Sequence, residues 1–149
     1  MSHKNRTIIG FDSFEGLDQP GAFDIDPRSN VPFFSKGSVK GWKANTISHK
    51  LSERHKCSIE LIEGWIPACF KGYEDKKFVF AHIDVDLYQA TMDSLEFIYE
   101  RLVSGGVILF DDYGFVMCAG ARKAIDEFMA GKPEPVILIP TGQAFLIKQ

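Results

Sequence analysis

Two nearly continuous apolar runs, separated by a stretch with helical periodicity, constrain the fold of this chain most strongly. The runs are Phe78–Val85 and Val107–Phe110, and consecutive apolar positions are typical of strands covered on both faces of a sheet. Between them, Ala90–Val103 repeats apolar residues at helical spacing. The following Ser104-Gly105-Gly106 can end that helix in a left-handed cap. This order predicts a strand, a helix and a second strand.

The alternation continues towards the C-terminus. A second amphipathic helix is predicted at Ala119–Ala130, where Gly131 stops it. Strands at Val136–Ile139 and Ala144–Ile147 are joined by a turn-rich link. Strands that alternate with helices indicate an α/β fold with a mostly parallel sheet and right-handed crossovers, here closed by an antiparallel hairpin. Shorter patterns predict strands at Thr7–Phe11 and Ser58–Ile62 and a helix at Ala44–His55.

Length and composition limit the class of protein. The 149 residues suit one domain, and the net charge of −3 gives no electrostatic footprint for nucleic acid. Basic residues are scattered and the longest apolar stretch is far too short to span a bilayer, so no membrane contact is expected. The three cysteines, Cys57, Cys69 and Cys118, have no CxxC spacing. They are interpreted as reduced thiols of a cytoplasmic protein.

The segment Leu17–Lys43 differs from the rest of the chain. It contains prolines and glycines together with Phe33, Phe34 and Trp42 among polar residues. Such a composition predicts a long loop, which is either a lid over a substrate or a mobile stretch of surface.

Aspartates follow both of the central apolar runs. Asp84 and Asp86 end the first run, and Asp111-Asp112 follows the second. The carboxyl ends of parallel strands form the ligand-binding edge of open α/β sheets, so the four carboxylates are expected to converge. Like charges in close contact repel one another, and a hard divalent cation such as Mg²⁺, Mn²⁺ or Ca²⁺ relieves that cost. Because side chains alternate along a strand, Asp84 and Asp86 share one face, and one can bind metal while the other takes a proton.

Each aspartate pair also has an explanation without metal. Asp-Asp-Tyr-Gly can simply end a strand in a turn, and the first pair can cap the following helix. Tyr88 and Thr91 are expected to pack and cap that helix. His82 lies on the same strand face as Asp84, but a lone histidine in an apolar strand is usually a hydrogen-bonded core residue. His3, His49 and His55 show no ligand spacing.

The stretch HIDVDLYQATMDSLEFIYERLVSGGVILFDDYG resembles the core motif of the macrocin O-methyltransferase (TylF-type) family. GFDSFEGL, IEGW and GARKAIDEF extend the resemblance over most of residues 6–149. The resemblance implies a class I, Rossmann-like methyltransferase fold with helices on both faces of the sheet. It also implies transfer of a methyl group from S-adenosylmethionine to a hydroxyl of a sugar or glycoside substrate. Metal dependence is expected, because coordination lowers the pKa of a sugar hydroxyl.

Positions that match the family motif take over the family's roles. The resemblance places the metal ligands at Asp84, Asp111 and Asp112 and the general base at Asp86. It places the ribose-binding residue at Asp12, although Asp-Ser-Phe after a strand is also a common turn. Glu63 and Gly64 follow a strand and can approach the adenine; an ordinary turn explains them equally well.

The chain departs from the family pattern at its start. Thr7–Phe11 matches the family's second strand, so the first central strand and the glycine-rich cofactor loop are expected to be missing from a truncated domain spanning residues 1–149. The open strand edges then predict a homodimer. A non-catalytic remnant that serves as a binding module is an alternative. A glycosyltransferase that uses the D-x-D is another, and DDYG and DSFEGL argue against it.

Overall fold

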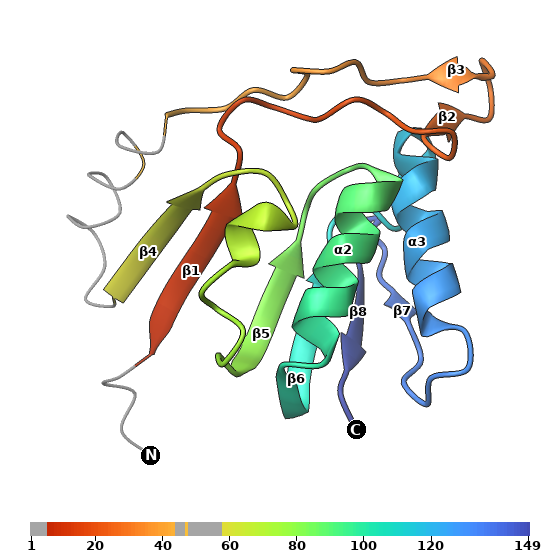
Figure 1. Ribbon diagram of the computed structural model, residues 1–149. Coiled ribbons are helices and arrows are strands. Elements are labelled where there is room, and N and C mark those ends of the chain that lie inside the picture. The colour runs from red at the N-terminus through yellow and green to blue at the C-terminus, as the bar shows by residue number, and fades with distance from the viewer. Residues whose placement is uncertain (1–5, 44–46, 48–57) are drawn as a thin grey trace.

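A computed structural model describes residues 6–43, 47 and 58–149, which form an α/β fold with the main strands side by side (Figure 1). The strands are β1 (Thr7–Asp12), β2 (Ile25–Asp26), β3 (Val31–Pro32), β4 (Ser58–Glu63), β5 (Phe78–Ile83), β6 (Leu102–Phe110), β7 (Ile137–Leu138) and β8 (Ala144–Ile147). The helices are α2 (Tyr88–Tyr99) and α3 (Ala119–Met129), with short 3₁₀ turns η1 (Ala68–Phe70) and η2 (Val116–Cys118). The strands predicted from the apolar runs are all present, with ends shifted by a few residues.

The main sheet has the strand order β5-β6-β8-β7. Strands β5 and β6 are parallel, whereas β8 runs antiparallel to both β6 and β7. Strand β7 is therefore parallel to β6, with β8 inserted between them. The predicted parallel pair and the predicted C-terminal hairpin are confirmed. A second parallel pair is formed by β1 and β4.

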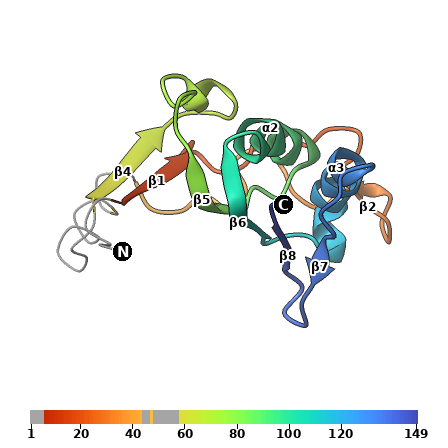
Figure 2. The same ribbon diagram turned by 90° about the horizontal axis from the view of Figure 1, so that it is seen from below.

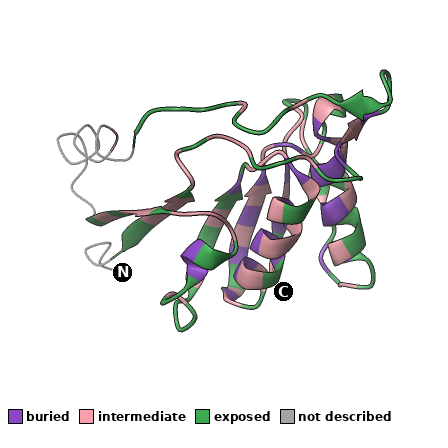
Figure 3. Ribbon diagram, turned by 45° about the horizontal axis from the view of Figure 1, so that its top comes forward, coloured by how far each residue is buried: buried purple, intermediate pink, exposed green. Residues whose placement is uncertain are grey.

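Helices α2 and α3 lie on the same face of the main sheet (Figure 2). The expectation of helices on both faces is therefore wrong for the described residues. Both crossovers, from β5 to β6 and from β6 to β7, move across the sheet in the same direction, and right-handed crossovers of that kind place their helices on one side. The core forms under these helices from Leu95, Ile98 and Ile125, together with Ile108, Phe110 and Leu146 of the strands. Figure 3 shows this burial beside the exposed and half-buried β1 and β4.

Helix α2 ends earlier than its apolar periodicity predicts. The prediction was Ala90–Val103, but the helix stops at Tyr99 and β6 begins at Leu102. Leu102 pairs with Phe78 across the sheet and is buried in the core. Strand pairing therefore overrides the helical pattern in these last residues. Helix α3 confirms the predicted second helix, whereas the helix predicted at Ala44–His55 falls almost wholly outside the described residues.

An aromatic row connects the β1–β4 pair to the rest of the fold. Phe11 of β1 packs edge-on against Phe70 of η1, with ring centroids 5.1 Å apart. Phe70 in turn stacks on Phe97 of α2 at 4.3 Å. Within the described residues no strand pairing joins β1 to β5. Side-chain packing through η1 therefore contributes to holding the two parallel pairs together.

The segment 17–43 is anchored to the helices by one buried carboxylate. Asp24 Oδ1 accepts a hydrogen bond from the Tyr88 backbone N–H at 2.7 Å, at the start of α2. Its Oδ2 accepts one from the Gly21 N–H at 2.7 Å. A Cβ at Gly120, in the first turn of α3, would overlap Asp24 Oδ1. Asp24 thus holds the segment against the first turns of both helices, and a glycine is required beside it.

Two of the three cysteines lie within the described residues, which also allow the expectation about membrane-spanning helices to be checked. Cys69 and Cys118 are buried free thiols, while Cys57 lies outside the described residues, as do His3, His49 and His55. No helix within the described ranges is long and apolar enough to cross a bilayer.

Candidate active site

The acidic residues lie where two parallel strands end side by side. The last residue of β5, Ile83, pairs with the last residue of β6, Phe110. Asp84 and Asp111 therefore leave the sheet next to each other, each followed by a further acidic residue in its loop. Buried apolar residues fix both strand ends, because Ile83 and Phe110 belong to the hydrophobic core.

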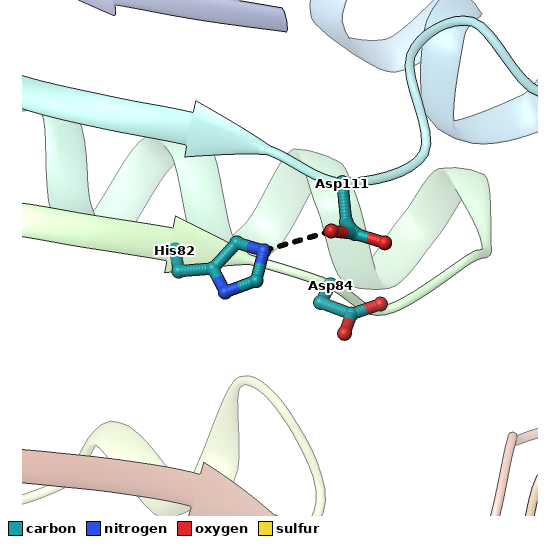
Figure 4. A group of neighbouring side chains, drawn as sticks. All are labelled: His82, Asp84 and Asp111. Carbon is teal, nitrogen blue, oxygen red and sulfur yellow. Dashed lines mark hydrogen bonds and ion pairs between the residues drawn. The ribbon is translucent and has the colours of Figure 1, made fainter. Parts of the chain in front are cut away.

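The first acidic group consists of His82, Asp84 and Asp111, which offer ligand atoms within 4.8 Å of one another. His82 Nε2 lies 3.1 Å from Asp111 Oδ1, and Figure 4 shows Asp84 beside this pair. Burial, followed by the charge of Asp111, raises the pKa of Asp84. Two carboxylates and an imidazole on one exposed face form a donor set that suits a divalent cation.

His82 is not the core residue that the apolar strand predicted. Its side chain is 40% exposed, because alternation along β5 turns Ile83 to the core and His82 to the opposite face, in front of the strands in Figure 4. The hydrogen bond that was expected of it is present, to Asp111. The two-residue spacing from Asp84 was the sequence signal that could have added His82 to the candidate ligands.

The second group consists of Asp86, Asp112 and Cys118, again with ligand atoms within 4.8 Å. Asp112 Oδ2 accepts hydrogen bonds from the Asp86 N–H at 2.9 Å and the Val85 N–H at 3.3 Å. The Cys118 thiol donates to Asp86 Oδ1 at 3.4 Å. Asp86 has a φ of 59°, a left-handed conformation that is uncommon outside glycine. The bonds to Asp112 hold the β5–α2 turn in this conformation.

Burial raises the pKa of every residue in the second group. It is the main cause that raises the pKa of Asp112 to about 6, and the charge of Asp86 adds to it. The pKa of Asp86 is raised for the same reason, while its hydrogen bond to Cys118 acts in the opposite direction. The pKa of the Cys118 thiol is raised by burial and by the two carboxylates. The thiol therefore remains a proton donor in the hydrogen bond at neutral pH.

The three residues proposed as metal ligands thus divide between the two groups. Asp84 and Asp111 lie with His82, whereas Asp112 lies with Asp86 and bonds to backbone amides of the β5–α2 turn. These bonds stabilise a different turn from the one predicted at Asp-Asp-Tyr-Gly. That predicted turn is present as well, because the Phe115 N–H donates to the Asp112 carbonyl at 3.1 Å. Cys118 comes from η2, 32 residues along the chain from Asp86, and no local sequence pattern indicated it.

A cavity of about 360 Å³ extends from the end of β5 to the end of β1. Asp84 and Asp86 line one part of it, and Asp12 and Gly64 line another. Leu17 and Trp42, from the segment 17–43, also contribute to its walls. Asp12 Oδ1 accepts a hydrogen bond from the Phe14 N–H at 2.6 Å, so the turn expected as an alternative at this position is present. Glu63 pairs with Asp12 across the strands and is exposed outside the cavity lining.

Comparison with protein families gives one match over most of the chain. The model described as Macrocin-O-methyltransferase (TylF) matches residues 1–140. Demethyldecarbamoylnovobiocin O-methyltransferase of Streptomyces niveus is 23% identical over 129 residues, which cover 85% of this chain and 48% of that protein. Mycinamicin III 3''-O-methyltransferase of Micromonospora griseorubida is 26% identical over 129 residues, 84% of this chain and 50% of that protein. The chain therefore spans about half the length of these curated relatives.

A solved structure shares the fold. The structure of the O-methyltransferase NovP superposes with a TM-score of 0.80 at 22% identity, covering 99% of this chain and 62% of that one. At this level of identity the similarity shows the fold alone, which is a methyltransferase-like α/β fold.

Proposed function

The chain belongs to the macrocin-O-methyltransferase (TylF) family, and from that premise we propose that its cavity serves the transfer of a methyl group from S-adenosylmethionine to a sugar hydroxyl. The observation that carries this proposal is one cavity lined by Asp12 and Gly64 at one part and by Asp84 and Asp86 at another. A group-transfer reaction requires the two reactants to meet in one such space.

We assign the β1 part of the cavity to the cofactor. An acidic residue at the end of a sheet strand suits the hydroxyls of a ribose, because a carboxylate accepts two hydrogen bonds. Asp12 occupies this position. Gly64 follows the neighbouring strand β4, and its N–H donates to the Asp12 carbonyl at 2.9 Å. Of the predicted pair Glu63 and Gly64, only Gly64 lines the cavity, so we assign the adenine contact to Gly64.

We assign the β5 end of the cavity to the acceptor sugar, and the group of His82, Asp84 and Asp111, which shares Asp84 with the cavity wall, to a divalent cation. Asp84 and Asp111 supply carboxylate oxygens for the cation, and His82 adds a nitrogen beside them. Asp112, the third predicted ligand, lies in the adjoining group and would join through a rotation of its side chain. A cation bound there would lower the pKa of a sugar hydroxyl and fix its orientation.

Asp86 is proposed as the base that accepts the hydroxyl proton. Its pKa is raised by burial, and a carboxylate with a raised pKa is a stronger base than an exposed one. The Cys118 thiol holds Oδ1 of this carboxylate, which orients the side chain. We further propose that segment 17–43 acts as a lid, since its residues line the cavity beside the aspartates.

A non-catalytic binding module is the second candidate. The observation in its favour is that Asp112 and Asp86 already accept hydrogen bonds from a backbone amide and from the Cys118 thiol, so this group is satisfied without a cation. In this case the cavity would bind a ligand without turning it over.

Methyl transfer to glycoside acceptors, with and without EDTA, tests the metal-dependent reaction. Activity is expected to disappear with EDTA and to return with Mg²⁺ or Mn²⁺. The variant Asp86→Asn is the matched control, because it should lose turnover while retaining the cation. Full turnover in EDTA would refute the metal role. Calorimetric titration with S-adenosylmethionine separates the two candidates: no heat at millimolar cofactor favours the binding module.

A further inference from the structure

One oxygen of Asp111 receives two hydrogen-bonding groups from different parts of the chain. Gln143 Nε2 donates to Asp111 Oδ1 at 2.6 Å, and His82 Nε2 lies 3.1 Å from the same atom. The side chain of Gln143 is partly buried, which shields this contact from competing water. Both contacts engage Oδ1, and Figure 4 shows the other oxygen, Oδ2, on the side of the carboxylate away from His82.

Gln143 itself is held in a defined position. It precedes β8 in the hairpin turn, where its carbonyl accepts a bond from the Ile139 N–H at 2.9 Å. The Thr141 hydroxyl contacts Gln143 Oε1 at 3.1 Å, and this contact fixes which end of the amide faces Asp111. This hairpin turn is bonded to the loop after Asp112, because the Gly114 N–H donates to the Gly142 carbonyl at 2.7 Å.

The contact between these two turns leaves no room for adjustment. A Cβ at Gly114 would lie 2.6 Å from the Gly142 carbonyl oxygen, closer than any real contact of that kind. The backbone of the β7–β8 turn is therefore packed directly on the loop that carries the acidic residues. The amide of Gln143 reaches Asp111 from a rigid support.

We propose that Gln143 is a positioning residue, which orients Asp111 for a divalent cation at the site of His82, Asp84 and Asp111. This inference rests on the proposed function of that site. Hydrogen-bond partners behind a metal ligand fix its orientation, and their loss typically weakens metal binding by about 10- to 100-fold. A neutral amide also holds Asp111 near Asp84 without adding charge that would compete with the cation.

The test is the affinity of the full chain for Mn²⁺, followed by electron paramagnetic resonance of the free ion. Gln143→Met keeps the length of the side chain and removes its donor, so it should weaken binding by about ten-fold or more. Thr141→Ser is the matched control in the same turn; it keeps the hydroxyl that contacts Gln143 Oε1 and should change the affinity by less than about two-fold. Gln143→Asn is a second polar variant, too short to reach Asp111, and should behave like Gln143→Met.

The possible results separate this inference from the proposed function. Wild-type affinity in both Gln143 variants would overturn the positioning role and leave the metal site standing. A wild-type chain that binds no Mn²⁺ would overturn both. Mn²⁺ binding that depends on Gln143, in a chain without methyl transfer, would support the positioning role and remove the proposed reaction alone.

Discussion

Replacing Asp24 by Ala tests how segment 17–43 is held on the fold. The Asp24 side chain accepts two backbone hydrogen bonds of 2.7 Å, from Tyr88 and Gly21. The residue is only 7% exposed, so water cannot easily replace the lost acceptor. The substitution should therefore lower the free energy of unfolding and loosen one wall of the cavity.

The size of the effect follows from these contacts. A hydrogen bond to a charged group contributes about 1.5–3 kcal/mol, and the loss of a capping residue at a helix start costs about 0.5–2 kcal/mol. Because removing the carboxylate also removes the cost of burying it, the net loss should be roughly 2–4 kcal/mol. For a domain of this size that corresponds to a fall in melting temperature of about 5–15 °C.

Urea unfolding and thermal melting of the two chains measure this loss. Asp18→Ala is the matched control in the same segment, because Asp18 is exposed and pairs with Lys36 at the surface. Exposed pairs contribute at most about 1 kcal/mol, so this variant should melt close to wild type. If Asp24→Ala also melted within about 1 °C of wild type, the anchoring role of Asp24 would be refuted.

Two further predictions concern Asp112 and the open strand edges. Burial raises the pKa of Asp112 from 3.8 to about 6. The folded chain without metal therefore holds this proton more tightly than the unfolded chain, and it should lose stability as the pH rises from about 4 to 6. The amide oxygen of Asp112→Asn still accepts the backbone bonds, so this variant should be more stable than wild type by on the order of 2–3 kcal/mol at pH 7. Urea unfolding in EDTA across this range measures it, and equal pH slopes for both chains would contradict it. Among residues 6–43, 47 and 58–149 no strand pairs with the second edge of β1 or of β5, and the exposed residues of these strands include Ile8 and Phe80. We expect a second copy to pair there. Light scattering should give a dimer that Phe80→Lys weakens, and a monomer at every concentration would exclude this pairing.

The sequence predicted those parts of the fold that depend on local patterns. Apolar runs located β5 and β6, and helical spacing located α3. Strand ends followed by aspartates predicted the acidic site without any knowledge of the packing. The end of α2 was mispredicted because Leu102 satisfies a helical period and a strand pairing equally well, and only its pairing with Phe78 decides between them.

Contacts between distant segments were not predictable in the same way. Asp24 accepts a hydrogen bond from the N–H of Tyr88, 64 residues further along the chain. Gln143 donates one to Asp111, 32 residues before it. Neither residue belongs to a pattern with a period, and each has an ordinary local role, in a loop and in a hairpin turn. The structure was needed to show that these turns close on the strand ends.

The long-range contacts also change the electrostatic argument for a metal. The sequence alone predicted that a cation offsets the repulsion between the converging aspartates. In the structure, Asp112 accepts backbone N–H bonds, Asp111 accepts the amide of Gln143, and Asp86 accepts the thiol of Cys118. Neutral donors therefore offset part of the repulsion, although the raised pKa of Asp112 shows that a cost remains. It follows that the fold does not depend on a cation to offset this repulsion, so the role that we propose for a cation is in the chemistry and not in folding.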